Sequence, residues 1–179
     1  MAPLPIETDV LPGVPSPEVL GRELRDGHSP DLTRRRWIVG LSLIGTAAAQ
    51  LISLFQVGVL KRLPDPPLPK LDSSRVDASR EAHRWLAMPD GPLMLGSYAA
   101  TAALAASGGI DRARTAPIIP LAMAAKTTVD AALSIALARR SWTQLGAFCF
   151  YCQVSMVCSI ASAVLAAPEA RRAARSLRG

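Results

Sequence analysis

Three stretches of the 179-residue chain, residues 37–60, 91–110 and 141–167, contain no Asp, Glu, Lys or Arg. Each reaches the ~20 mostly apolar residues that a helix needs to cross the hydrocarbon core of a bilayer. Only 19% of the residues are charged, which is below the ~25% of an ordinary soluble domain. This pattern excludes an ordinary cytoplasmic enzyme and a disordered chain. The net charge of +6 is spread along the flanks of the apolar stretches, so no nucleic-acid binding is expected.

A fourth apolar segment is interrupted only by Lys126 and Asp130. The sequence therefore predicts an all-α fold, an integral membrane four-helix bundle within residues 33–168. Gln50 is an amide within the first span, and we expect it to face the bundle interior, where an amide can find a partner. We expect Pro168 to end the last helix. The four expected spans cover about residues 37–60, 92–110, 117–138 and 142–167.

The segments around these spans are polar. Prolines punctuate residues 1–32, which predicts a disordered Pro-rich tail, with a short helix around 17–26 capped by Ser16. Residues 169–179 form a basic tail, and residues 61–90 form a loop that we expect to cap the bundle at the membrane surface. Four spans place both termini on one side. The Lys and Arg counts of the two sides are nearly equal, so the positive-inside rule only weakly favours cytoplasmic termini.

The strongest chemical feature is Cys149-Phe150-Tyr151-Cys152, which we place one to three turns inside the fourth span. Residues three apart share a helix face, and two such thiols can close a disulfide if the turn relaxes. A CxxC pair also favours a reactive thiolate. The alternative is that both cysteines are small apolar residues in a packed helix. Cys158 lies half a helical revolution from Cys149, and we expect it to serve packing.

Lys126 and Asp130 form an i, i+4 pair inside the third expected span. Ionisable side chains are costly inside a bilayer, so a function is the default hypothesis. A mutually neutralising pair that fixes the helix rotation is the alternative. Asp130 lies about as far before Arg140 as the CxxC lies after it, so antiparallel packing would bring them level. We therefore predict that Lys126 favours the Cys152 thiolate and that Asp130 exchanges a proton with the site.

Four spans, a polar loop after the first and a CxxC opening the fourth resemble the vitamin K epoxide reductase family, over about residues 36–167. Residues 148–152, FCFYC, resemble the family's aromatic-rich redox motif beside its quinone pocket. Residues 73–80, SSRVDASR, resemble its loop segment. The opening of its second helix is matched more loosely, by Gly91-Pro92, Gly96 and Tyr98.

This resemblance implies a membrane thiol-disulfide oxidoreductase whose CxxC exchanges electrons with a quinone. Cys152 would be the thiolate that faces the quinone, and Cys149 would be the thiol that exchanges with a partner. The quinone would lie near Ser79, Tyr98 and Phe148. In the family, the loop and the CxxC lie toward the extracytoplasmic face, which supports a bacterial-type inner (plasma) membrane protein with cytoplasmic termini.

The loop departs from the family in one important way. The family loop carries two cysteines that pass electrons between a partner protein and the CxxC, whereas residues 61–90 contain none. Ser73 takes the position of the second of these cysteines, and a hydroxyl cannot take part in thiol-disulfide exchange. The chain therefore resembles a bacterial member lacking the loop cysteine pair. A thioredoxin-like periplasmic partner would have to reach Cys149 directly.

Two other functions stay open. A non-catalytic relative would keep the bundle as a structural or accessory subunit of a larger membrane complex. A small transporter or channel built on Lys126 and Asp130 is disfavoured, because four short helices leave little room for a pathway. Exposure separates the oxidoreductase from the subunit, since a working Cys149 must be reachable. His28 and His83 show no metal-ligand spacing, so no metal is expected.

Overall fold

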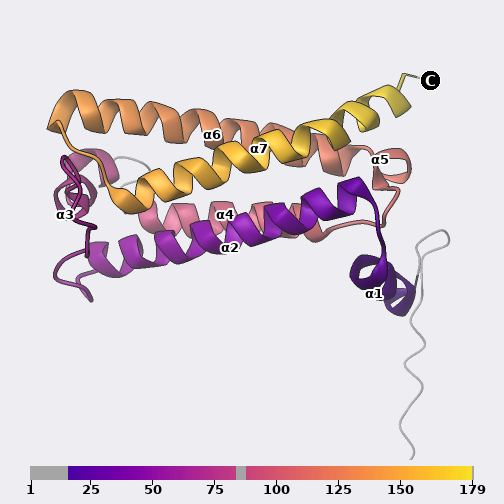
Figure 1. The fold of residues 1–179 in the computed structure, drawn as a ribbon, viewed down its shortest axis with the longest axis horizontal. Coiled ribbons are helices and arrows are strands. Elements are labelled where there is room, and N and C mark those ends of the chain that lie inside the picture. The colour runs from indigo at the N-terminus through magenta and orange to yellow at the C-terminus, as the bar shows by residue number, and fades with distance from the viewer. Residues whose placement is uncertain (1–15, 84–87, 179) are drawn as a thin grey trace, which may run out of the picture.

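The computed structural model describes residues 16–83 and 88–178, and the regular elements of that part are helical. This confirms the predicted all-α class. Four long helices run lengthwise beside one another (Figure 1), namely α2 (Pro30–Gln56), α4 (Asp90–Ala106), α6 (Ile118–Leu145) and α7 (Phe150–Ser176). The shorter elements are α1 (Pro17–Asp26), α3 (Ser73–Asp77), a 3-10 helix (Arg80–His83) and α5 (Arg112–Thr115).

Three of the long helices, α2, α6 and α7, are long and apolar enough to cross a membrane. Their most apolar windows have mean hydropathies of 1.9, 1.4 and 1.7. Helix α4 has 17 residues, and at ~1.5 Å of rise per residue it is shorter than a typical span. The lengths of the helices therefore support three spans and do not establish the fourth.

The long helices do not pack equally on one another. Helix α2 packs extensively on both α4 and α7, and α6 packs on α7, whereas α4 and α6 touch each other much less. Gly45 of α2 allows its close approach to α4, because a Cβ at this position would lie only 2.3 Å from Cζ of Tyr98. Because α4 and α6 contact each other so little, space remains between them inside the bundle.

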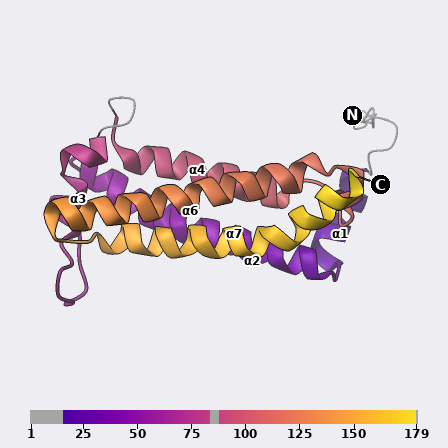
Figure 2. The ribbon, with the colours of Figure 1, turned by 90° about the horizontal axis from the view of Figure 1, so that it is seen from above.

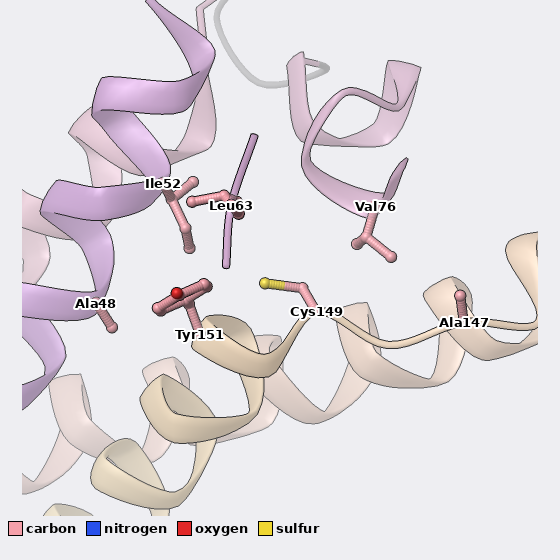
Figure 3. Close-up of a cluster of buried hydrophobic side chains, with 7 residues drawn as sticks. All are labelled: Ala48, Ile52, Leu63, Val76, Ala147, Cys149 and Tyr151. Atoms are coloured by element: carbon pink, nitrogen blue, oxygen red, sulfur yellow. The ribbon is translucent and has the colours of Figure 1, made fainter. Parts of the chain in front are cut away.

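The molecule has two distinct ends (Figures 1 and 2). Helix α3 and the start of α7 lie at one end, which we call the loop end, while α1 and the last turns of α7 lie at the other, the terminal end. Each end has its own apolar cluster. The cluster at the loop end contains Leu63 and Val76 from the loop and Cys149 and Tyr151 from the last connection and α7 (Figure 3).

Two sequence expectations about the helices are wrong. Gln50 is exposed on α2, because the buried face of this helix is formed by small and apolar residues such as Ala49 and Ile52. Helix α7 continues through Pro168 to Ser176. Its last turns are held in place, since Glu169 pairs with Arg112 and the Ser176 hydroxyl donates to the Ala113 carbonyl at 2.8 Å.

The structure also refines the tail and the last connection. Helix α1 confirms the short helix expected around 17–26, with Ser16 as its N-cap, and residues 1–15 lie outside the described part. Helix α6 extends past the expected span end to Leu145 and is capped by Gly146 with a φ of +63°. A helix end and a span end need not coincide, because Arg139 and Arg140 tolerate a helical backbone outside the hydrocarbon.

Candidate functional site: a dithiol on the wall of a cavity

The CxxC lies at the first turn of α7 rather than inside the helix. Cys149 is the N-cap residue, with φ −89° and ψ 126°, and its Sγ accepts a hydrogen bond from the Cys152 backbone N–H at 3.1 Å. The prediction that the pair lies one to three turns inside a helix beginning near residue 142 is wrong, because α7 begins at Phe150. Both cysteines are free thiols.

The loop seals Cys149 from outside, and only 1% of its surface is exposed. Phe148 pairs with the loop through two backbone hydrogen bonds, from its own N–H to the Lys70 carbonyl at 2.9 Å and from the Asp72 N–H to its carbonyl at 3.0 Å. Ser73 then continues the contact. Its hydroxyl accepts the Phe150 N–H at 2.8 Å and donates to Asp65. The serine at the family's cysteine position thus holds the loop against the start of α7.

Asp77, which the sequence analysis did not single out, is the ionisable neighbour of the thiols. It is 1% exposed, and its Oδ1 accepts a hydrogen bond from Cys152 Sγ at 3.6 Å. Burial raises the pKa of Asp77 from 3.8 to about 7. The thiols of Cys149 and Cys152 oppose this rise through hydrogen bonds, while the charges of Asp90 and Asp65 add to it. A carboxyl group that binds and releases a proton near neutral pH therefore lies against the dithiol.

A cavity of about 430 Å³ opens beside this group, which is within the range of small-molecule sites. Cys149, Cys152 and Asp77 form part of its wall, and apolar side chains of α4 and α6 form much of the rest. Two buried polar atoms on this wall, Asp77 Oδ2 and Ser155 Oγ, have no hydrogen-bond partner among the described residues. Unpaired buried polar atoms are costly, and Arg35 Nε at the terminal end is a third such atom among the described residues.

The structure brings two of the three predicted quinone-site residues to this cavity. Ser79 and Tyr98 both line it. The Tyr98 hydroxyl is already used, because it donates to the Ser155 carbonyl at 2.7 Å and lies 3.1 Å from Ser159 Oγ. Phe148 is not part of the lining, and its ring stacks on Trp142 with 5.1 Å between centroids. The expectation that Phe148 borders the site is therefore not met by the geometry.

Lys126 lies away from the thiols. Its Nζ lies 2.5 Å from Asp130 Oδ2, 2.5 Å from the Ser97 carbonyl and 2.6 Å from Thr101 Oγ1, so its donors are occupied by α4 and by its own helix. The predicted contact of Lys126 with Cys152 is absent from the described interactions. Asp130 does line the cavity, on the α6 wall. Asp130 and the CxxC thus line the same cavity, whereas the Lys126 ammonium turns toward α4.

Asp77, Cys149 and Cys152 also have the spacing of a metal site. One ligand atom from each lies within 4.8 Å of the others. Two thiolates and a carboxylate suit a thiophilic ion such as Zn²⁺. The absence of a metal, expected from the sequence, therefore stays a prediction.

Sequence comparison supplies the chemical context of this dithiol. The model of the vitamin K epoxide reductase family matches residues 36–167, which is most of the chain and includes α4, α6, the loop and the CxxC. No curated protein and no solved structure matches the chain.

Proposed function

We propose that this chain, which belongs to the vitamin K epoxide reductase family, is a membrane thiol-disulfide oxidoreductase. In this proposal Cys149 and Cys152 pass two electrons to a quinone bound in the cavity. The observation that carries it is the cavity itself, because one wall holds both thiols and a carboxyl group at the loop end of the bundle. The reaction class is inferred from the family, and the cavity beside the two thiols supports the proposal.

The proposal includes a four-span topology in a bacterial-type inner membrane. Helix α4 would be the short fourth span, packed along α2 (Figure 1). The described ends of the chain lie together at the terminal end, in α1 and the last turns of α7, as expected for an even number of spans. Both termini would be cytoplasmic, and the loop and dithiol would face the opposite side.

The cavity residues fit a quinone ring. The two ring oxygens of a quinone accept hydrogen bonds, and they would need donors in a site that excludes water. The Ser155 hydroxyl and the protonated Asp77 carboxyl can each supply one, since neither Ser155 Oγ nor Asp77 Oδ2 has a partner among the described residues. Ser79 and Tyr98 would border the ring. The sequence did not single out Ser155, because a serine in an apolar helix usually returns its hydrogen bond to its own backbone.

The reaction balances within the site. A quinone supplies a two-electron, two-proton acceptor. Cys149 and Cys152 each lose a proton, their sulfurs form one S–S bond, and the electron pair passes to the acceptor with both protons. Cys152 is the half-buried thiol and would face the quinone, while Cys149, at the helix N-terminus, would exchange with a partner.

A thioredoxin-like periplasmic partner would have to move the loop before it could exchange with Cys149. No loop cysteine can relay electrons, and the bonds of Lys70, Asp72 and Ser73 to residues 148–150 cover the sulfur. We therefore propose that partner binding displaces residues 61–79 and breaks these few hydrogen bonds.

The alternative function is that of a non-catalytic subunit in a larger membrane complex. The specific observation in its favour is the 1% exposure of Cys149 together with the missing loop cysteines. In this case the cavity would hold a quinone or lipid without electron transfer.

Thiol trapping in native membranes tests the two functions. Cells are quenched in acid, free thiols are alkylated, and disulfides are then reduced and alkylated with a heavier reagent. Mass spectrometry reads each cysteine separately, before and after addition of menadione, a small naphthoquinone. We expect a Cys149–Cys152 disulfide whose occupancy rises with menadione, while Cys158 stays reduced. Two thiols that stay reduced at all menadione concentrations would contradict electron transfer and favour the subunit.

A Ser155→Ala variant adds a binding readout. It should raise the menadione concentration needed for half-maximal disulfide formation by roughly 5- to 10-fold, as expected for one lost hydrogen bond of about 1–1.5 kcal/mol. Ser162→Ala provides the matched control, because Ser162 is a buried serine of the same helix outside the cavity lining.

A further inference from the structure

Three side chains that can ligate a metal meet where the loop covers the start of α7. Cys149 and Cys152 come from the first turn of α7 and Asp77 from the end of α3, and one ligand atom of each lies within 4.8 Å of the others. Asp77 and Cys149 are each 1% exposed, and Cys152 is half-buried. The sequence prediction of no metal considered only the two histidines, and it could not bring together Asp77 and Cys152, which are 75 positions apart.

The separations of these ligand atoms agree with those around a tetrahedral ion. Zn–S bonds of about 2.3 Å and Zn–O bonds of about 2.1 Å place a sulfur and an oxygen ligand about 3.6 Å apart. The distance from Cys152 Sγ to Asp77 Oδ1 is 3.6 Å. Two sulfur ligands of one ion lie about 3.8 Å apart, and the C-x-x-C spacing is the usual two-sulfur half of a zinc site. The three side chains therefore need little rearrangement to share an ion.

The three ligands are held in place by backbone hydrogen bonds that a bound ion would leave intact. The Ser73 hydroxyl accepts the N–H of the residue after Cys149 at 2.8 Å, which fixes the loop against the first turn of α7. The Gln56 amide donates to the backbone carbonyl of Asp77 at 3.3 Å. The Cys152 N–H donates to Cys149 Sγ at 3.1 Å and so orients that sulfur. Such outer contacts orient metal ligands and raise the affinity of a site.

The described charges around the three ligands favour a divalent cation. Asp77 Oδ2 is buried on the cavity wall and has no hydrogen-bond partner among the described residues. The carboxylates of Asp65 and Asp90 add negative charge around it. Helix α6 contributes one charge of each sign to the cavity lining, Arg140 and Asp130. A divalent ion would offset the remaining negative charge most directly, because it binds the carboxylate and both sulfurs at once.

We propose that Asp77, Cys149 and Cys152 bind a thiophilic divalent metal ion, Zn²⁺ being the one expected, and that a water or a cavity ligand completes its tetrahedral set. Each thiol gives up its proton for a metal–sulfur bond, so one bound ion releases two thiol protons. A two-electron oxidant breaks both metal–sulfur bonds, because the sulfurs give up two electrons and form one S–S bond, and the ion leaves with its charge unchanged. The bound ion therefore keeps the dithiol reduced. This site does not depend on the quinone reaction.

Titration with Co²⁺ alone tests the site, in the metal-free, reduced, full-length protein in lipid nanodiscs. We expect a thiolate-to-cobalt charge-transfer band in the near ultraviolet that saturates at one ion per chain and disappears when Zn²⁺ is added. Cys152→Ser should lose this band. Asp77→Asn should weaken binding by at least roughly 10- to 100-fold, because even the loss of an outer contact costs that much. Cys158→Ser and Asp111→Asn, the latter at an exposed acid of the terminal end, should bind as wild type.

Two results of this titration would overturn the site. One is a wild-type protein without the charge-transfer band, and the other is an Asp77→Asn variant with wild-type affinity.

Oxidation by diamide, which needs no quinone, tests the protection of the dithiol. At a Zn²⁺ concentration about 10-fold above its dissociation constant, about a tenth of the sites are free, so disulfide formation should be about 10-fold slower than with EDTA. Bound Zn²⁺ that leaves the rate unchanged would contradict the protection.

The metal site and the quinone reaction fail separately. Co²⁺ binding in a protein whose thiols menadione does not oxidise would support the metal site and contradict only the proposed quinone reaction. Menadione-driven disulfide formation in a protein that binds no Co²⁺ would overturn the metal site alone.

Discussion

Both ends of the bundle bury charged or ionisable side chains, but the two ends differ in how these side chains are paired. At the terminal end, Arg35, Arg112 and Glu169 are each at most 2% exposed. Arg112 binds both oxygens of Glu169 and the carbonyls of Leu104 and Ser107 near the end of α4. Arg35 donates to the carbonyls of the same turn, at 3.0 Å to Gly109 and 3.0 Å to Ile110.

The loop end holds a buried acid, Asp77, for which no ion pair is found among the described residues, together with two thiols and a cavity. Charges that are paired and hydrogen-bonded hold elements together, whereas a group left short of partners is available to a ligand or a reaction. The comparison therefore separates the scaffold of this protein from its site without reference to any relative. Each variant below alters one side of that comparison.

The largest loss in the free energy of unfolding is expected from Glu169→Gln. This change leaves Arg35 and Arg112 buried without their shared carboxylate, and breaking one partner of a buried ion pair costs about 3–5 kcal/mol. Denaturant unfolding in detergent micelles, followed by tryptophan fluorescence, measures the loss. Arg172→Gln is the control, because the Arg172 side chain is exposed and Asp31 keeps its pair with Arg34, so the loss should be less than about 1 kcal/mol. Equal losses in the two variants would remove the distinction drawn for the terminal end.

The next effect concerns the pH dependence of stability. Asp77 has a pKa of about 7 in the fold and an ordinary value of 3.8 in the unfolded chain. Between these values the native state keeps the proton that the unfolded state has lost, so the free energy of unfolding falls as pH rises from about 4 to about 7. The fall is at most roughly 4 kcal/mol.

Asp77→Asn should flatten this part of the stability profile and make the protein more stable than wild type above pH 7. Urea unfolding of both proteins at several pH values measures it, with Asp111→Asn as the control that should keep the wild-type slope. A variant that retains the slope would show that another group carries it.

Hydropathy predicted the all-α class and the regions of the long helices, because the bilayer imposes a length and a composition on any span. The family could also be predicted from the sequence, because the CxxC motif follows the third apolar segment as it does in the family. The burial of Asp77 could not be predicted, because nothing in a polar loop segment indicates which of several acids will be buried. Arg35 and Arg112 were counted as flanking charges at the membrane surface, and only tertiary packing shows that they pair with Glu169. The side of α6 to which Lys126 turns likewise depends on Ser97 and Thr101 of another helix.

Gly45→Ala tests the middle of the bundle, between the two ends. The new Cβ would lie 2.3 Å from the Tyr98 ring, so α2 and α4 must separate or the ring must move. Overpacking of this kind costs about 1–3 kcal/mol, and movement of Tyr98 should also weaken menadione binding in the cavity. Gly40→Ala is the matched control on α2, because no atom lies within 4 Å of its added Cβ, and it should be neutral or slightly stabilising. Unfolding curves that coincide for the two variants would contradict this account of the helix contact.

The smallest effect on stability, about 1–2 kcal/mol, is expected from Ser73→Ala, which removes the acceptor of the Phe150 N–H and the donor to Asp65. Its effect on access should be larger, since the Ser73 hydroxyl ties the loop to the start of α7. We expect faster alkylation of Cys149 in native nanodiscs, with Cys158 as the internal reference.

Ser74→Ala distinguishes a specific seal from general loosening of the loop. The Ser74 hydroxyl accepts the Leu63 N–H at 2.9 Å within the loop and has no described bond to α7. It should cost similar stability without exposing Cys149. If both variants raise the alkylation rate equally, the loop opens as a unit and Ser73 has no special role. If only Ser73→Ala does so, the serine at the family's cysteine position is the contact that a partner must break to reach the dithiol.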